Sequence, residues 1–178
     1  MRLRFLGTGA SGGTPGRGRS RRQESSLVVD AGVRIVIDVT RDFERQSALE
    51  DLDAVLLTHA HADACGGVAQ LRRWLRARDM ERLPLYASAA TIAALEKRFR
   101  RLDHCDFNPV RPGQRRRRLF SHLTIDRELA RLCDWEVERI VLTQIGRTAP
   151  PHERLERAVR RLCARARPAY DGLVLELH

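Results

Sequence analysis

Lysine is almost absent from this sequence, because Lys97 is the only lysine among 33 basic residues. The arginines give the chain a formal net charge of +10, which would suit a nucleic-acid partner. They are spread along the whole chain, however, and the aromatic residues that could stack on bases amount to only 5%. We therefore expect most arginines to lie on a solvated surface, and any nucleic-acid binding to be weak and electrostatic.

Long apolar runs are also missing, so no membrane-spanning helix is predicted. The first ten residues, MRLRFLGTGA, lack the apolar stretch of a secretory signal peptide, and we expect a cytoplasmic protein with no membrane partner. The cysteines show neither C-x-x-C pairs nor the spacing typical of a disulfide framework. We therefore predict that all of them are reduced thiols: Cys65, Cys105, Cys133 and Cys163.

The length of 178 residues suits one domain with a substantial core, so residues 1–178 are predicted to form a single domain. Apolar β-type runs predict strands at residues 2–6, 26–29, 33–37, 54–57, 139–143 and 170–177. Apolar periodicity predicts helices that begin near Val68, Ser88, Thr124 and Pro151. A hairpin comes first and strands then alternate with helices, which favours a layered α/β or α+β domain with mixed sheets.

Two of the predicted helices have a distinct apolar face. In the first helix this face consists of Val68, Leu71, Trp74 and Leu75. In the last helix it consists of Leu155, Ala158, Val159 and Leu162. Ser88 is a plausible N-cap of the second helix, because a serine hydroxyl can accept a hydrogen bond from a free backbone N–H there.

Polar side chains follow three of the predicted strands, where loops held by a rigid sheet usually carry function. The run RIVID ends at Asp38, and the run RIVLTQ ends at Gln144. Between them, LTHAHADACGG places His59, His61 and Asp63 at intervals of two residues, directly after an apolar strand. Neutral imidazoles and carboxylates are good ligands for zinc and similar ions. The sequence therefore predicts a metal site at this strand end.

Several segments together resemble the metallo-β-lactamase superfamily: FLGTGASGGTP, VIDVT and LLTHAHADACGG. Near the C-terminus, RIVLTQIGR and AYDGLVLEL resemble the branch that contains phosphonate-pathway cyclic phosphodiesterases and tRNA-maturation nucleases. The resemblance implies an α+β fold, the four-layer αββα sandwich. It also implies a hydrolase in which a bound metal ion activates water, with Zn²⁺ as the expected ion and Mn²⁺ as the alternative. The substrate it implies is a phosphodiester or a related small ester.

The same resemblance implies roles for individual residues. His59 and His61 match ligands of a first metal ion, and Asp63 matches a ligand of a second ion that also orients the attacking water. Asp38 matches a buried aspartate that braces the site from behind the ligands. His122 resembles a histidine that lies near the site and relays protons, so Asp63 and His122 are the candidate catalytic residues.

The sequence departs from this family pattern in three places. Ala64 stands where a histidine is expected, and Gln144 replaces another, although its carbonyl oxygen could still bind a metal weakly. Only QRRRR lies between NPVRPG and LFSHLTID, so a segment with a third histidine and a bridging aspartate is missing near residues 113–120.

These departures predict one bound ion rather than two, in a sandwich that is abbreviated in the middle. The alternative is a degenerate, non-catalytic member that binds one metal or none. Its basic surface would then serve weak nucleic-acid or protein binding. The missing segment would also leave a sheet edge uncovered, which would permit a homodimer.

Other residues allow more than one interpretation. The glycine-rich segment 7–22 lacks the spacing of a nucleotide-binding P-loop, and its arginines either touch substrate phosphates or belong to a plain surface loop. Cys65 is interpreted as a packed residue rather than a soft metal ligand. His104 is assigned to a surface turn and His152 to a neutral role at a helix start. Asp171, in a DG pair before the last strand, has either a structural or a functional role.

Overall fold

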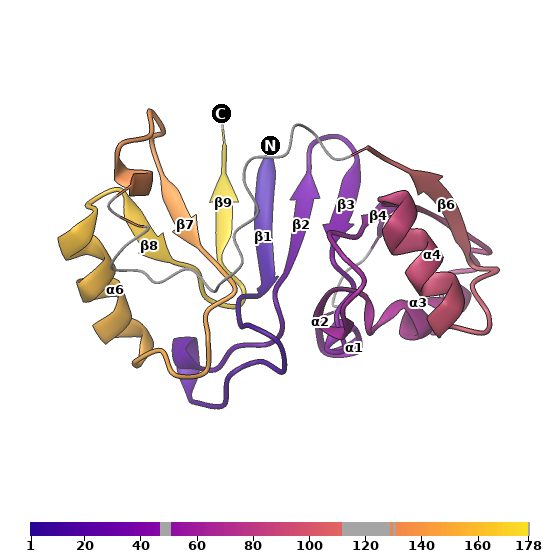
Figure 1. The fold of residues 1–178 in the computed structure, drawn as a ribbon, viewed down its shortest axis with the longest axis horizontal. Helices are drawn as coiled ribbons and strands as arrows, with labels where there is room; N and C mark the ends of the chain where they lie inside the picture. Colours follow the sequence, from indigo (N-terminus) through magenta and orange to yellow (C-terminus); the bar gives the residue numbers. More distant parts are fainter. Residues whose placement is uncertain (47–50, 112–128, 130, 178) are drawn as a thin grey trace.

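The computed structural model describes residues 1–46, 51–111, 129 and 131–177 (Figure 1). Within these ranges the strands form one sheet of seven strands and a smaller sheet of two. Both chain termini lie at the same end of the sheets (Figure 1). No helix in the described ranges has the length and apolarity needed to cross a lipid bilayer.

Six of the strands in the described residues match predicted ranges, but β9 is shorter than predicted and the strands at 83–87, 105–109 and 166–168 were not predicted. The strands are β1 (Arg2–Gly7), β2 (Ser26–Asp30), β3 (Arg34–Ile37), β4 (Ala54–Leu56), β5 (Leu83–Ala87), β6 (Cys105–Pro109), β7 (Ile140–Leu142), β8 (Ala166–Pro168) and β9 (Val174–Glu176). The larger sheet has the order β6-β5-β4-β3-β2-β1-β9. Its β9-β1-β2-β3 part is antiparallel, and β3 to β6 run parallel. The β2–β3 hairpin turns at Gly32, whose φ of +86° is one that glycine adopts without strain.

Helices connect the parallel strands, as crossover connections require. The helices are α1 (Phe43–Gln46), α2 (Ala62–Cys65), α3 (Val68–Arg76), α4 (Ala89–Arg98) and α6 (His152–Leu162), with a 3-10 turn η1 (Gly18–Ser20). The predicted apolar face of α3 is buried completely, and it packs with Val36, Val55 and Leu85 of the larger sheet. Ser88 caps α4 as predicted, since its Oγ accepts a hydrogen bond of 3.2 Å from Thr91 N.

The second sheet, β7-β8, covers the opposite face, and α6 packs on its outer side (Figure 1). Successive residues of a strand point to opposite faces. Accordingly, Leu6 of β1 lies in the core beneath α1 to α4, whereas Phe5 lies in the core between the sheets. In β7, Val141 faces that inner core while Ile140 and Leu142 pack toward α6. The order of layers is therefore αββα, and the predicted α+β sandwich is confirmed.

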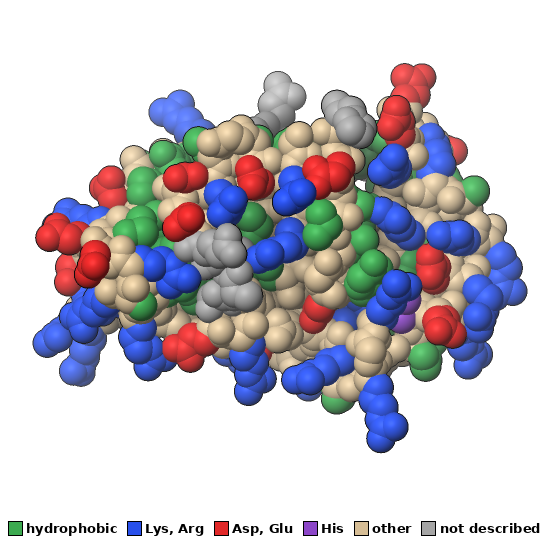
Figure 2. All heavy atoms as spheres, turned by 180° about the vertical axis from the view of Figure 1, so that it is seen from behind, with side chains coloured by type: hydrophobic (Ala, Val, Ile, Leu, Met, Phe, Trp, Pro, Cys, Tyr) green, Lys and Arg blue, Asp and Glu red, His purple; other side chains and the backbone are tan. Residues whose placement is uncertain are grey.

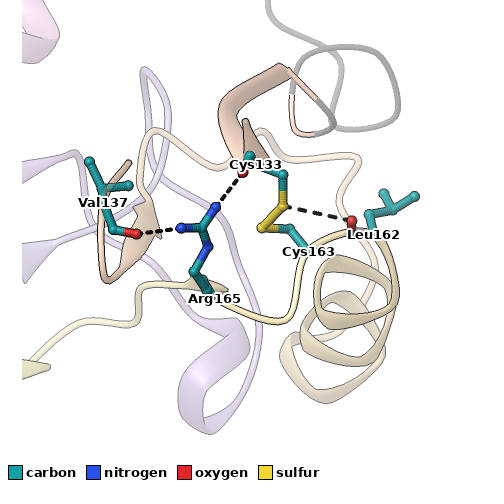
Figure 3. Close-up of a disulfide and its surroundings, with 5 residues drawn as sticks. All are labelled: Cys133, Val137, Leu162, Cys163 and Arg165. Carbon is teal, nitrogen blue, oxygen red and sulfur yellow. Dashed lines mark hydrogen bonds between the residues drawn. A yellow bond between two sulfur atoms is a disulfide. The ribbon is translucent and has the colours of Figure 1, made fainter. Parts of the chain in front are cut away.

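The prediction of reduced thiols is wrong for two of the four cysteines, because Cys133 and Cys163 form a disulfide across 30 positions of sequence (Figure 3). It is confirmed for Cys65 and Cys105, which are free and buried. The bridge joins the end of the helical segment at 131–133 to the residue that follows α6. Packing of these two elements into one apolar cluster brings the two sulfurs together, and sequence spacing does not reveal such packing.

Two other expectations also need correction. Leu162 does not lie on the buried face of α6 but is 45% exposed, because the helix ends there and Cys163 occupies the buried position instead. His104 lies in a turn, as expected, but its side chain is not at the surface. It is only 4% exposed, and its Nε2 lies 2.9 Å from the carbonyl oxygen of Val68. Most of the helix predicted near Thr124, and the segment 113–120, fall outside the described residues.

Candidate metal centre

The candidate metal centre lies at the carboxyl ends of two adjacent parallel strands, β3 and β4. Ile37 pairs with Leu56 at these ends, and Asp38 N donates a 2.9 Å hydrogen bond to Leu56 O. The chain that leaves β4 carries the two histidines and then enters α2, whose first turn contains Asp63. Such strand ends are the usual location of ligand sites in parallel sheets, because the loops there are held by the sheet.

The structure brings His59, His61 and Asp63 together. One ligand atom from each residue lies within 4.8 Å of the other two. His59 Nε2 is 3.6 Å from Asp63 Oδ1, and the two imidazole rings are perpendicular with centroids 4.9 Å apart. His61 is exposed and the other two are half-buried, so the cluster is reachable from solvent.

Thr58 connects this cluster to Asp38, a link that the sequence patterns did not reveal. The Thr58 hydroxyl lies 2.8 Å from Asp38 Oδ2 and 2.8 Å from His59 Nδ1. An ionised carboxylate only accepts hydrogen bonds, so the hydroxyl donates to Asp38 and accepts from His59 Nδ1–H. His59 is thereby held in the tautomer whose Nε2 lone pair faces Asp63.

Asp38 is buried at 6% exposure and has a positive φ of 65°. Residues other than glycine seldom adopt this backbone conformation, and such residues cluster at functional sites. Burial raises the pKa of Asp38, and the two hydrogen bonds that Thr58 donates offset part of this effect. The structure therefore places Asp38 behind His59, where a bracing residue would lie.

These donors fit one divalent ion. Two imidazole nitrogens and one carboxylate supply three ligands, which is the usual protein contribution to a catalytic zinc with an open position. The tautomer of His59 leaves its Nε2 available to such an ion. The predicted binding of one metal ion is thus compatible with the donor set, while the choice between zinc and manganese stays a prediction.

A buried glutamate and an arginine flank the cluster, and neither was singled out from sequence. Glu24 is 1% exposed, and its Oε1 accepts hydrogen bonds from Gly12 N (2.7 Å) and Arg41 Nε (3.0 Å). Burial alone would raise the pKa of Glu24, but the hydrogen bonds from Arg41 and Gly12 outweigh it and lower the pKa. Glu24 therefore stays ionised and ties the glycine-rich segment to the loop after β3.

Part of the glycine-rich segment is not a surface arm, because Arg22 is 4% exposed. Its Nη1 donates to Thr8 Oγ1 (2.7 Å) and to the carbonyl oxygen of Ala169 (2.5 Å), and its Nη2 lies 3.0 Å from His152 Nδ1. Guanidinium groups only donate, so His152 Nδ1 accepts and the imidazole is neutral there. The network fixes the segment to α6 and to the chain before β9.

Asp171 belongs to the same network. It accepts hydrogen bonds from Thr8 Oγ1 (2.8 Å) and Gln23 N (2.6 Å), and burial raises its pKa. These bonds tie the turn at Asp171 and Gly172, where the φ of Gly172 is +87°, to the beginning of the glycine-rich segment and to Gln23. The strand predicted over residues 170–177 is therefore shorter, because this turn precedes β9.

The structure also describes three other residues that the sequence singled out. Gln144 is exposed after β7 with a φ of 58°, and among the described residues no hydrogen bond joins its side chain to the histidines. Ala64 contributes only a methyl group and is fully buried. Cys65 is buried as well, burial raises the pKa of its thiol, and its Sγ lies 3.2 Å from Ala60 O, as expected of a packed residue. His122 lies outside the described residues.

Comparison with known proteins gives matches to a family model and to parts of two curated proteins. The family model described as "Beta-lactamase superfamily domain" matches residues 26–117. An octanoyltransferase from Porphyromonas gingivalis is 41% identical over 88 residues, which are 40% of this chain and 18% of that protein. A ribonuclease Z from Methanopyrus kandleri is 32% identical over 117 residues, which are 62% of this chain and 40% of that protein. The aligned part of the chain thus spans less than half the length of either curated relative.

Two solved structures share the arrangement over nearly the whole chain. A diphosphatase from the PhnP family superposes with a TM-score of 0.84 at 22% identity, covering 99% of this chain and 98% of the other. The metallo-β-lactamase fold protein YhfI from Bacillus subtilis gives a TM-score of 0.70 at 13% identity, covering 99% of both chains. At these identities the likeness establishes the fold.

Proposed function

Because this chain belongs to the metallo-β-lactamase superfamily, we propose that it is a metal-dependent hydrolase of a phosphodiester or a related phosphate ester. The observation that carries the proposal is the convergence of His59, His61 and Asp63 at the ends of β3 and β4. Among the similar proteins, one is named a ribonuclease and another a diphosphatase, which supports a phosphate-containing substrate.

In this proposal each residue of the centre has a defined task. His59 and His61 hold one ion through imidazole nitrogens, and Asp63 completes the donor set. When bound, the ion supplies Lewis-acid activation of a water molecule and of a phosphoryl oxygen. Asp63 also accepts a hydrogen bond from the attacking water. Asp38 acts through Thr58 and keeps His59 oriented, and is therefore a positioning residue.

We further propose that the centre holds one ion and hydrolyses its substrate slowly. The position of Ala64 offers no ligand atom, and the exposed Gln144 offers at most an amide oxygen. A second ion would normally clamp both oxygens of an in-line displacement. Without that clamp, the substrate phosphorus is less well aligned, and alignment supplies much of an enzyme's rate.

The test joins metal analysis to a rate measurement. Protein purified without added metal is titrated with Zn²⁺ and then Mn²⁺, and hydrolysis of bis(p-nitrophenyl) phosphate is followed. We expect close to one ion per chain and turnover well below the typical enzyme rate of about 10 per second. His59→Ala combined with His61→Ala should lose both. Asp106→Asn changes an exposed carboxylate on β6 and serves as the control.

The alternative, a degenerate member of the family without catalytic activity, is tested by the same experiment. It is favoured by Ala64 and Gln144, which stand where the family pattern has histidines. If the wild-type chain binds an ion stoichiometrically but shows no turnover above the double variant with either metal, the hydrolase proposal fails. Turnover near 10 per second that depends on His59 would instead show that other residues complete the site.

A further inference from the structure

Two arginines from distant parts of the chain meet at Ser11, beside the candidate metal centre. Arg41 Nη2 lies 3.4 Å from Ser11 Oγ, and Arg147 Nη2 lies 3.4 Å from Ser11 O. Arg147 Nε also donates a 3.1 Å hydrogen bond to Gly13 O. Both guanidinium groups thus border the same residue of the glycine-rich segment, and all three side chains at this border are exposed.

Arg41 connects this place to the metal centre. Its Cγ lies so close to Gly66 that a Cβ at Gly66 would collide with it. Gly66 directly follows α2, which carries Asp63 in its first turn. The pKa of Arg41 is raised mainly by Glu24, and Asp63 contributes to the same effect. Arg41 therefore lies at the edge of the cluster and not on a remote surface.

The positive charge here is only partly neutralised. Buried Glu24 pairs with Arg41, but Arg147 contacts only carbonyl oxygens of Ser11 and Gly13 within the described part of the chain. Gly12 contributes by having no side chain, because a Cβ there would collide with Arg147 Nη2. One guanidinium charge therefore faces solvent next to the centre without an acidic partner among those residues.

The backbone of the glycine-rich segment does not offer an anion cradle of its own. Gly12 N already donates to Glu24 Oε1 at 2.7 Å, and Gly13 N donates to Ala10 O at 2.8 Å. An anion at this place must therefore be bound by the guanidinium groups. A guanidinium group is planar and presents paired N–H donors whose spacing matches two oxygens of a phosphate group. It also keeps its positive charge at all ordinary pH values.

We propose that Arg41 and Arg147 form a phosphate subsite that holds a second phosphate group of the substrate, next to the phosphate that is cleaved at the metal centre. Among phosphate esters, the preferred substrate class is then one that carries a second phosphate group next to the phosphate that is cleaved, as an organic diphosphate does. The subsite can bind a diphosphate whether or not the metal centre hydrolyses it. Only the statement that the neighbouring phosphate is cleaved rests on the proposed function.

The experiment measures binding without catalysis. Methylenediphosphonate, a diphosphate analogue that water does not hydrolyse, is titrated by calorimetry into metal-free protein at constant ionic strength, because diphosphonates chelate metal ions. Arg147→Gln should weaken binding about tenfold or more, as expected for loss of a charge-assisted hydrogen bond. Arg147→Lys should bind more tightly than Arg147→Gln but less tightly than the wild type, since lysine keeps the charge but lacks the paired N–H donors of arginine. Arg154→Gln removes an exposed arginine on α6 and should leave binding unchanged.

Equal affinity of the wild type and Arg147→Gln would overturn the subsite. So would an equal loss in Arg154→Gln, because that result indicates general electrostatic attraction. Thermal unfolding of each variant verifies that the fold is intact. The two proposals can fail separately. If Arg147→Gln loses affinity for methylenediphosphonate but the wild type shows no turnover, only the hydrolase proposal is contradicted. If the wild type shows turnover but Arg147→Gln keeps its affinity, only the subsite is contradicted.

Discussion

Thr58 matters at the scale of single residues because its one hydroxyl serves two neighbours. It donates to the buried Asp38 and accepts from His59 Nδ1–H. Residues that orient a metal-binding imidazole through its second nitrogen affect metal affinity strongly without touching the ion. The role of Thr58 is therefore separable from that of the ligands themselves.

We expect Thr58→Val to weaken metal binding about 10- to 100-fold, because His59 loses the acceptor that fixes its tautomer. The measurement is a competition titration between the protein and a chromophoric chelator. Thr58→Ser keeps the hydroxyl and should bind metal nearly as the wild type does. Unchanged affinity in Thr58→Val would show that the hydroxyl does not orient His59.

At the scale of elements, the disulfide anchors α6 and the segment before β7. It joins Cys133 to Cys163, and Arg165 donates hydrogen bonds to the carbonyl oxygens of Cys133 and Val137 beside it (Figure 3). The bridge joins residues 30 positions apart, and both cysteines belong to the apolar cluster between α6 and the smaller sheet. A cross-link of this kind restricts the unfolded chain more than the folded one.

We expect the double change Cys133→Ser and Cys163→Ser to lower the free energy of unfolding by about 2–4 kcal/mol. Urea unfolding with and without a thiol reductant provides the measurement. The reductant should destabilise the wild type but have no further effect on the double variant. If thiol titration of the unreduced, unfolded wild type finds four free cysteines, the bridge does not form under those conditions.

The N-terminal end of α6 depends on a neutral histidine. Burial lowers the pKa of His152, and the charge of Arg22 lowers it further, while Glu156 opposes this change. Arg19 also lowers the pKa and Glu153 raises it. The unfolded chain therefore takes up the proton more readily than the folded protein, whose Nδ1 must accept from Arg22.

The stability that His152 contributes is therefore fully present above its ordinary pKa of 6.5 and is lost as the pH falls below that value. We expect the urea midpoint to decrease between about pH 8 and pH 5.5. His152→Gln should reduce this decrease but not remove it, because burial lowers the pKa of His104 as well. An identical pH dependence in the variant would mean that other groups cause it.

At the scale of the whole molecule, the net charge of +10 is distributed and not concentrated. Figure 2 shows arginine and lysine side chains scattered over one face, with acidic side chains between them. A surface with dispersed positive charge attracts polyanions electrostatically, and this attraction does not depend on nucleic-acid sequence. Nucleic-acid binding, cytoplasmic location and a homodimer through a sheet edge all stay predictions.

We expect single-stranded RNA to bind weakly, and its affinity to fall steeply between about 50 and 200 mM salt, because binding by dispersed arginines releases counterions. Fluorescence anisotropy with two oligonucleotides of unrelated sequence provides the measurement and its own control. Tight binding at the higher salt concentration that distinguishes the two sequences would contradict the expectation.

The sequence by itself determined the local features of this protein. The spacing of Val68, Leu71, Trp74 and Leu75 predicted a buried helix face, because helical periodicity is contained in one short window. The same holds for the H-x-H-x-D motif, in which five residues after an apolar strand bring the metal-binding donors together. The strand and helix pattern predicted a layered α/β or α+β domain, and the αββα order of layers came from the family resemblance.

Only the tertiary structure decided which distant side chains meet. The pairing of Glu24 with Arg41, of Arg22 with His152 and of Cys133 with Cys163 follows from strand order and from the packing of α6. Spacing along the chain carries no signal for such contacts, since the two members of each pair lie far apart in the sequence. Burial then changed their chemistry, because a polar group removed from water must find a partner in the fold.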